Sequence, residues 1–146
     1  MKEIKFRVWD KETNKMYFQL NESPCFGLFE GDRAASIEDV FFYEKQRFEL
    51  MQYAGLKDKN GKEIYDGDVV KNSRCGSNRL MHVKWTDAIE EVSISGCEWT
   101  RQNPGFVFEN ISKGMTYVFI ANKDLEVIGN IYENPELLEE IQNARD

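Results

Sequence analysis

This sequence of 146 residues is poor in several residue types, and each shortage excludes a class of protein. Its three cysteines, Cys25, Cys75 and Cys97, lie far apart and form no CxxC pair. An odd and scattered set of cysteines predicts neither a disulfide framework nor a zinc site. With only three prolines and ten glycines, the chain is not collagen-like or of low complexity. No apolar run approaches the roughly 18 residues that a membrane-spanning helix needs.

The single histidine, His82, restricts the catalytic chemistry that the chain offers. A triad-type mechanism needs a base beside a nucleophile, and the residues next to His82 in the sequence include no serine or cysteine. Phosphate-binding GxxxxGK[ST] and GxGxxG motifs are also missing. These absences argue against a nucleotide-hydrolysing or dinucleotide-dependent enzyme.

Two acidic turns bear on metal binding. Residues 58–61 begin like a calcium loop, but Lys62 and Glu63 stand where such a loop needs an oxygen ligand and a glycine. The Asp66-Gly67-Asp68 corner offers two carboxylates to Mg²⁺, although Asp-Gly is more often a plain turn. We therefore expect no cofactor and no enzymatic activity, with a metal-dependent hydrolase as the last alternative.

Acidic residues outnumber basic ones by 26 to 19, which gives a net charge of −7. Such a chain gains no long-range attraction to nucleic acids or anionic membranes. Residues 71–84 run against this balance, because they contain no acidic residue. The candidate interaction residues of this basic stretch are Lys71, Arg74, Arg79, His82 and Lys84. The alternative function is therefore a nucleic-acid-binding module, and the other interpretations of the stretch are an acidic protein partner and a solvated hairpin.

The alternation of apolar residues predicts a mainly β fold. Residues 3–20 alternate on both sides of a polar turn, which predicts a β-hairpin. Residues 21–36 predict a loop, and residues 37–43 fit either a helix or a strand. A further strand is expected at 47–53, ending at Ala54-Gly55, and another begins at Val69. The remaining strands are expected at 79–86, 91–95, 105–109, 115–121 and 125–132.

The C-terminal residues change to a helical period. Asn134 suits the position that caps a helix, Pro135 suits the first turn, and Leu137, Leu138 and Ile141 fall on one side. We expect a helix over about 135–144, which is too short to be stable alone and must dock on the sheet.

Three stretches carry a family resemblance: 4–10 (IKFRVWD), 51–70 (MQYAGLKDKNGKEIYDGDVV) and 127–138 (VIGNIYENPELL). With these motifs in this order, the chain resembles the YopX family of small phage and prophage proteins. Residues 21–46 and 72–124 carry little of the resemblance. The resemblance implies an SH3-like barrel in the C-terminal part, preceded by a smaller β-rich portion. It implies no catalytic or metal-binding residue.

These patterns together predict a mainly β protein, α+β at most. The N-terminal β-hairpin portion is expected at 1–58, and an SH3-like barrel with a short C-terminal helix at 59–146. The expected function is that of a phage or prophage accessory protein of the host cytoplasm, which binds a protein partner or itself as a homo-oligomer. Trp9, Trp85 and Trp99 are the candidate aromatic interface. Alternatively, the aromatic residues fill the seam between the two portions.

Overall fold

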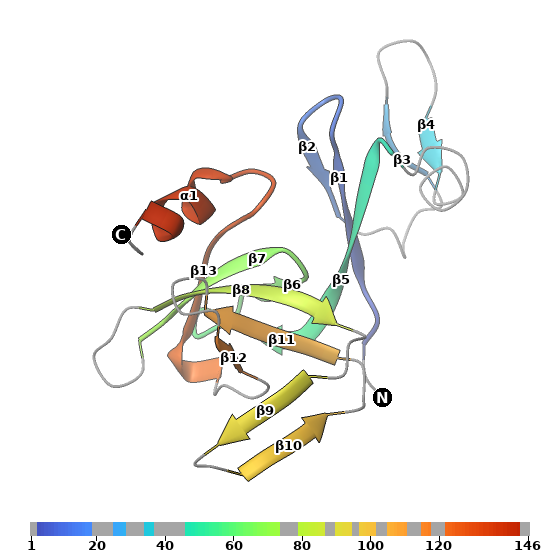
Figure 1. Ribbon diagram of the computed structural model, residues 1–146. Coiled ribbons are helices and arrows are strands. Elements are labelled where there is room, and N and C mark those ends of the chain that lie inside the picture. Colours follow the sequence, from blue (N-terminus) through green and yellow to red (C-terminus); the bar gives the residue numbers. More distant parts are fainter. Residues whose placement is uncertain are drawn as a thin grey trace.

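A computed structural model describes residues 3–18, 25–28, 34–36, 46–73, 79–86, 90–94, 97–101, 105–110, 115–117 and 122–143. Within these residues the protein is mainly β, with a single α-helix near the C-terminus (Figure 1). The predicted fold class is therefore confirmed. The strands form two larger antiparallel sheets and two small two-stranded ones.

The N-terminal sheet has four strands in the order β2-β1-β5-β6. They are β1 (Phe6–Asp10), β2 (Lys15–Tyr17), β5 (Phe48–Lys57) and β6 (Glu63–Tyr65). The β1–β2 pair confirms the predicted hairpin, in which Trp9 stands opposite Met16.

Strand β5 is longer than its sequence predicts. The expected end at Ala54-Gly55 is wrong, because the strand continues to Lys57. Gly55 has a φ of 81°, and the pairing with β6 shifts register beyond Tyr53. A glycine in this conformation accommodates a bulge rather than ending the strand.

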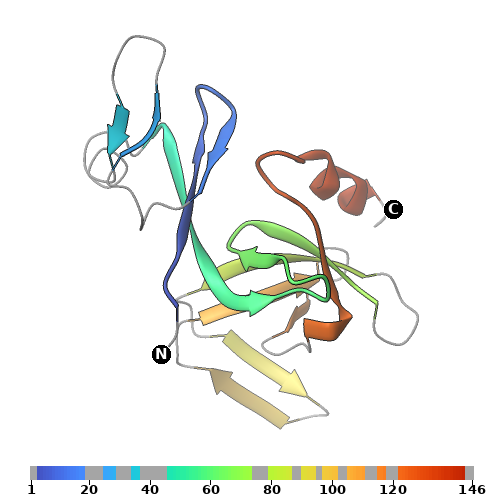
Figure 2. The ribbon, with the colours of Figure 1, turned by 180° about the vertical axis from the view of Figure 1, so that it is seen from behind.

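The second sheet, called the barrel sheet below, has five antiparallel strands in the order β12-β11-β8-β7-β13. They are β7 (Asp68–Asn72), β8 (Arg79–Thr86), β11 (Gly105–Asn110), β12 (Met115–Tyr117) and β13 (Leu125–Asn130). After the 3₁₀ turn η3 (Asn122–Asp124), β13 returns to pair with β7. A meander whose last strand pairs with its first is the strand order of an SH3-like barrel, and the sheet is curled (Figure 2).

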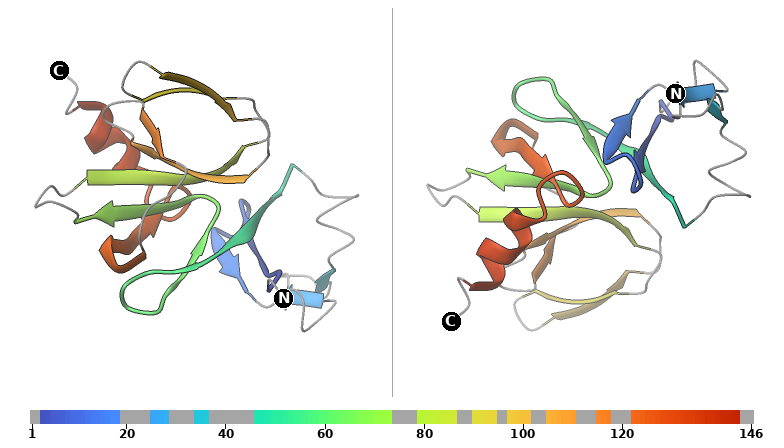
Figure 3. Two further views of the ribbon diagram at one scale, coloured as in Figure 1. Left: turned by 90° about the horizontal axis from the view of Figure 1, so that it is seen from below. Right: turned by 90° about the horizontal axis from the view of Figure 1, so that it is seen from above.

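Two small hairpins depart from the sequence prediction. The first, β3 (Cys25–Leu28) with β4 (Ala34–Ser36), occupies part of the predicted loop at 21–36. Its register shifts between Phe26 and Leu28, so Gly27 is tolerated within a strand. The second, β9 (Glu90–Ile94) with the unpredicted β10 (Cys97–Arg101), is inserted between β8 and β11 (Figure 3). Residues 37–43 lie outside the described residues.

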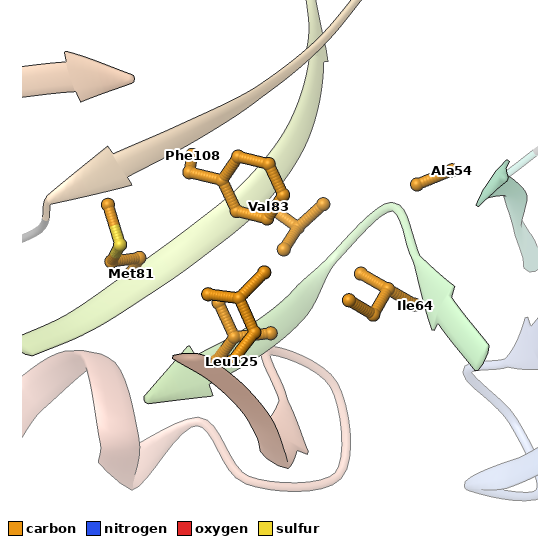
Figure 4. Close-up of a cluster of buried hydrophobic side chains, with 7 residues drawn as sticks. Ala54, Ile64, Met81, Val83, Phe108 and Leu125 are labelled. Carbon is orange, nitrogen blue, oxygen red and sulfur yellow. The ribbon is translucent and has the colours of Figure 1, made fainter. Parts of the chain in front are cut away.

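The core of the barrel sheet is one apolar cluster (Figure 4). It is formed by Val70, Met81, Val83, Phe108 and Leu125 of the sheet, together with Ala54 of β5 and Ile64 of β6. The N-terminal sheet therefore contributes side chains to the core of the barrel sheet.

Helix α1 (Glu136–Asn143) confirms the predicted C-terminal helix. Leu137 lies against Gly129, where an added Cβ would come within 2.9 Å of the leucine side chain. The carbonyl of Asn134 accepts from the amide of Leu137 at 3.1 Å, and its side-chain oxygen accepts from the amide of Asn130 at 3.4 Å. The helix is thus tied to the end of β13. No helix in the described part of the chain has the length and apolar character of a membrane span.

Candidate functional site

The basic stretch lies on two neighbouring strands of the barrel sheet. Lys71 belongs to β7, while Arg79, His82 and Lys84 belong to β8, and Arg74 lies outside the described residues. Lys71 stands opposite Leu80 in the register, so it shares a face of the sheet with His82 and Lys84. Successive side chains of a strand point to opposite faces, so Arg79, three residues before His82, falls on the opposite face. The described residues of the stretch therefore do not form one surface.

Acidic residues of neighbouring strands accompany these cations. The ammonium group of Lys84 is 2.9 Å from a carboxylate oxygen of Glu109 on β11. Glu126 of β13 stands directly opposite Lys71. A stretch without acidic residues in the sequence is therefore interleaved with carboxylates in the sheet.

His82 adds little charge to this face. Burial lowers its pKa, against the opposing effect of the Asp66 and Glu109 carboxylates. A histidine whose pKa is below its usual value is largely neutral at pH 7.

The three tryptophans have different environments. Trp9 is 7% exposed and stacks on Tyr132 with a centroid distance of 6.2 Å. It packs with Met51, Tyr53 and Tyr65 in the seam between the N-terminal sheet and the turn after β13. Trp85 is 44% exposed and lies edge-on to Phe106 at 4.9 Å. The side chain of Trp99 lies outside the described residues.

Among the described residues, the partners of the Asp58 carboxylate, which begins the calcium-like sequence, are backbone amides. One oxygen accepts from Asn60 at 2.8 Å and from Lys62 at 2.9 Å, and the other accepts from Val127 at 2.9 Å. These bonds close the turn and fasten it to β13. Burial would raise the pKa of Asp58, but the three amides outweigh it and lower the pKa.

The two carboxylates of the Asp66-Gly67-Asp68 corner serve different partners. Asp66 accepts from the amide of Trp85 at 3.0 Å, whereas Asp68 accepts from the amide of Tyr65 at 2.8 Å and pairs with Arg7. Across the described ranges, no group of three or more histidine, cysteine, aspartate or glutamate side chains is arranged to hold a metal ion.

A cavity of about 260 Å³ lies where the three family-like stretches meet. It is bounded by the N-terminal sheet on one side and by β13 and the turn that follows it on the other. Its lining residues are Arg7 of the first stretch; Lys62, Glu63, Tyr65 and Asp68 of the second; Val127, Gly129, Asn130 and Glu133 of the third; and Met16 and Phe18 at β2. This convergence makes the cavity the candidate functional site.

Arg7 is the central charged residue of the cavity, and it is 4% exposed. Its Nη2 donates to Asp68 at 2.5 Å and to the carbonyl of Asp66 at 3.4 Å. The guanidinium lies 4.7 Å from the ring centroid of Tyr65. Its Nε–H has no acceptor among the residues that the structure describes. Burial raises the pKa of Asp68 even though Arg7 opposes that effect.

Asn130 shapes the far wall of the cavity. Its side-chain oxygen accepts from the amides of Tyr132 at 3.0 Å and Glu133 at 2.8 Å. Its Nδ2 donates to Glu133 at 2.9 Å. These bonds fix the turn that leads from β13 to α1.

A model of the YopX protein family matches residues 5–139. This chain belongs to the YopX family. The match spans both larger sheets and all the residues that line the cavity. The fold of this YopX-family chain resembles the crystal structure of protein EF1440 from Enterococcus faecalis, with 23% identity and a TM-score of 0.54 over 94% of this chain and 99% of that one. No curated protein matches the chain.

Sequence reasoning did not single out Arg7, Asn130 or Glu133 as site residues. The available signal for Arg7 was a cation between apolar residues of an alternating strand. Its partner Asp68 is 61 residues away, so only the arrangement of the two sheets brings them together.

Proposed function

We propose that this chain is a non-enzymatic phage or prophage accessory protein that binds an extended segment of a partner protein. The observation that carries the proposal is the open outer edge of β2. This strand is the outermost of the N-terminal sheet, and no described strand pairs with its outer side. An exposed sheet edge binds extended segments through main-chain hydrogen bonds.

The strand register identifies which groups of β2 face outward. Two backbone hydrogen bonds flank the β1–β5 pair: the amide of Tyr53 donates to the carbonyl of Lys5, and the amide of Lys11 donates to the carbonyl of Arg47. They indicate that the backbone groups of the odd-numbered residues of β1 face β5. Because antiparallel strands alternate in this way, the even-numbered residues of β1 face β2, opposite Lys15 and Tyr17. The amide and carbonyl of Met16 therefore point toward the open edge.

Side chains beside this edge suit a binding surface. Phe18 follows β2 directly and is 56% exposed, and both Phe18 and Met16 line the cavity. In strand addition the main chain supplies affinity and neighbouring pockets supply specificity. The open edge of β2 would thus supply the affinity for a segment, and the cavity beside it the specificity.

The edge of β13 in the barrel sheet offers a contrast. There the amide of Val127 donates to Asp58, and the carbonyl of Leu125 accepts from the amide of Lys59 at 3.0 Å. The turn at 58–62 thereby covers this edge. The nucleic-acid alternative receives less support, because Lys84 pairs with Glu109.

The proposal is tested with short linear peptides selected on the wild-type protein from a phage-displayed library. Phe18→Pro removes the exposed ring and also the Phe18 backbone N–H, which faces the open edge as that of Met16 does. The matched Phe18→Ala removes only the ring. We expect Phe18→Pro to weaken peptide binding at least tenfold and Phe18→Ala to weaken it less, by fluorescence anisotropy. Peptides that bind Phe18→Pro as tightly as wild type would refute strand addition at this edge. If sedimentation shows that the wild-type protein forms dimers and that the dimer no longer binds the peptides, the segment bound at the β2 edge belongs to a second copy of the chain.

A further inference from the structure

We infer that the cavity beside β2 binds an acidic side chain, aspartate or glutamate, carried by the segment that pairs with the strand. This inference rests on the proposed function and specifies the partner. It follows from which polar groups in the cavity already have partners and which do not.

Two hydrogen-bond donors of the cavity, on Arg7 and Lys62, are available to a ligand. The Nε–H of Arg7 has no acceptor among the described residues, although the side chain is almost fully buried. Lys62, at the exposed rim of the cavity, forms no ion pair within the described part of the chain. A carboxylate is the group that accepts from a guanidinium and an ammonium together.

Most acceptors that line the cavity are already engaged. Glu63 accepts from Lys5 at 2.6 Å and from the hydroxyl of Tyr65 at 2.8 Å. Asp68 is paired with Arg7, and one oxygen of Glu133 accepts from the side-chain Nδ2 of Asn130. A cationic side chain would meet the exposed Glu133 carboxylate at the rim, while an anionic one would complete the bonding of the buried Arg7.

The register brings the partner segment close to Arg7. Tyr17 stands opposite Val8, so Phe18, one residue further, falls opposite Arg7. A residue paired with Phe18 directs its side chain to the same face of the sheet as Arg7. The Nε of Arg7 is buried in the unbound protein, and the exposed ring of Phe18 lines the same cavity.

The test uses three synthetic peptides of alternating threonine and valine that differ only in a central glutamate, glutamine or lysine. We expect the glutamate peptide to bind the wild-type protein at least tenfold more tightly than the glutamine peptide. Lys62→Met, at an exposed position, should reduce this preference severalfold. Lys123→Met, at an exposed lysine on η3, is the matched control and should leave the preference unchanged.

A direct readout is the NMR signal of the Arg7 Nε–H group, which should shift with the glutamate peptide and not with the glutamine peptide. Equal binding of all three peptides, or tightest binding of the lysine peptide, would overturn the inference. If those peptides still lose affinity with Phe18→Pro, the proposed function stands and only the acidic specificity fails. If none of the peptides binds, the inference is refuted.

Discussion

The barrel sheet and the N-terminal sheet bury their side chains in different ways. The core cluster of the barrel sheet is apolar and includes Met81, Val83 and Phe108. The N-terminal sheet also buries charged groups beside its apolar clusters: Asp10 is held by Arg47, and Arg7 pairs across the seam with Asp68 of β7. An apolar cluster depends on volume, whereas a buried ion pair depends on charge and direction. The two sheets should therefore respond to different perturbations.

Arg7→Met is the change that should break the seam between the sheets. It leaves the buried carboxylate of Asp68 without its cation, and we expect a loss of about 4 kcal/mol at pH 7 in urea unfolding. Because a raised pKa favours the protonated acid, the loss should shrink as the pH falls toward 4. Adding Asp68→Asn should recover part of the stability. An equal loss at both pH values would show that volume, not charge, dominates here.

Met81→Ala is the corresponding change in the barrel sheet. Met81 is 1% exposed, and truncation of a buried side chain leaves a cavity. We expect a loss of about 3 kcal/mol in urea unfolding. The loss should be the same at pH 7 and pH 4, since the cluster around Met81 contains no titratable group. A loss that changes with pH would contradict the contrast between the two sheets.

Acid should weaken the N-terminal sheet through Asp10. Burial would raise its pKa, but hydrogen bonds from Arg47, Thr13 and the amide of Glu12 lower it to about 2. The unfolded chain takes up the proton first, so the stabilisation is present above about pH 4 and is lost as the pH falls toward 2. We expect this contribution to be about 2 kcal/mol.

The contribution of Asp10 is measured by urea unfolding of wild type and Asp10→Asn between pH 6 and pH 3. The two stability curves should converge as the pH falls. Parallel curves would show that Asp10 does not titrate in this range.

Gly61→Ala should produce the smallest effect. Gly61 has a φ of 82° and an added Cβ would meet no atom within 4 Å, so the cost is backbone strain alone. We expect a loss of about 1 kcal/mol. Gly67→Ala should cost more, because its Cβ would also lie 3.2 Å from the ring of Tyr132 at the seam. Thermal unfolding of the two variants side by side compares an open turn with the packed seam, and equal losses would argue against tight packing there.

Local patterns in the sequence predicted most of the strands and the helix. The alternation around Trp9 and the helical period after Asn134 are properties of neighbouring residues, and both elements form as expected. Strand β6 has only three residues and β10 has little alternation, so neither stood out. The candidate site was harder to predict, because ion pairs such as Arg7–Asp68 and Lys84–Glu109 join residues on different strands.

Strand β5 takes part in all three buried clusters of the described residues. Phe48 packs in the N-terminal cluster, Met51 packs in the seam, and Ala54 belongs to the barrel core, which also contains Leu125. On the ribosome, β5 emerges well before β13, which carries its cluster partner Leu125. Part of the apolar surface of β5 therefore stays uncovered until β13 has been synthesised. A chain terminated before β13 would present that surface to chaperones and proteases.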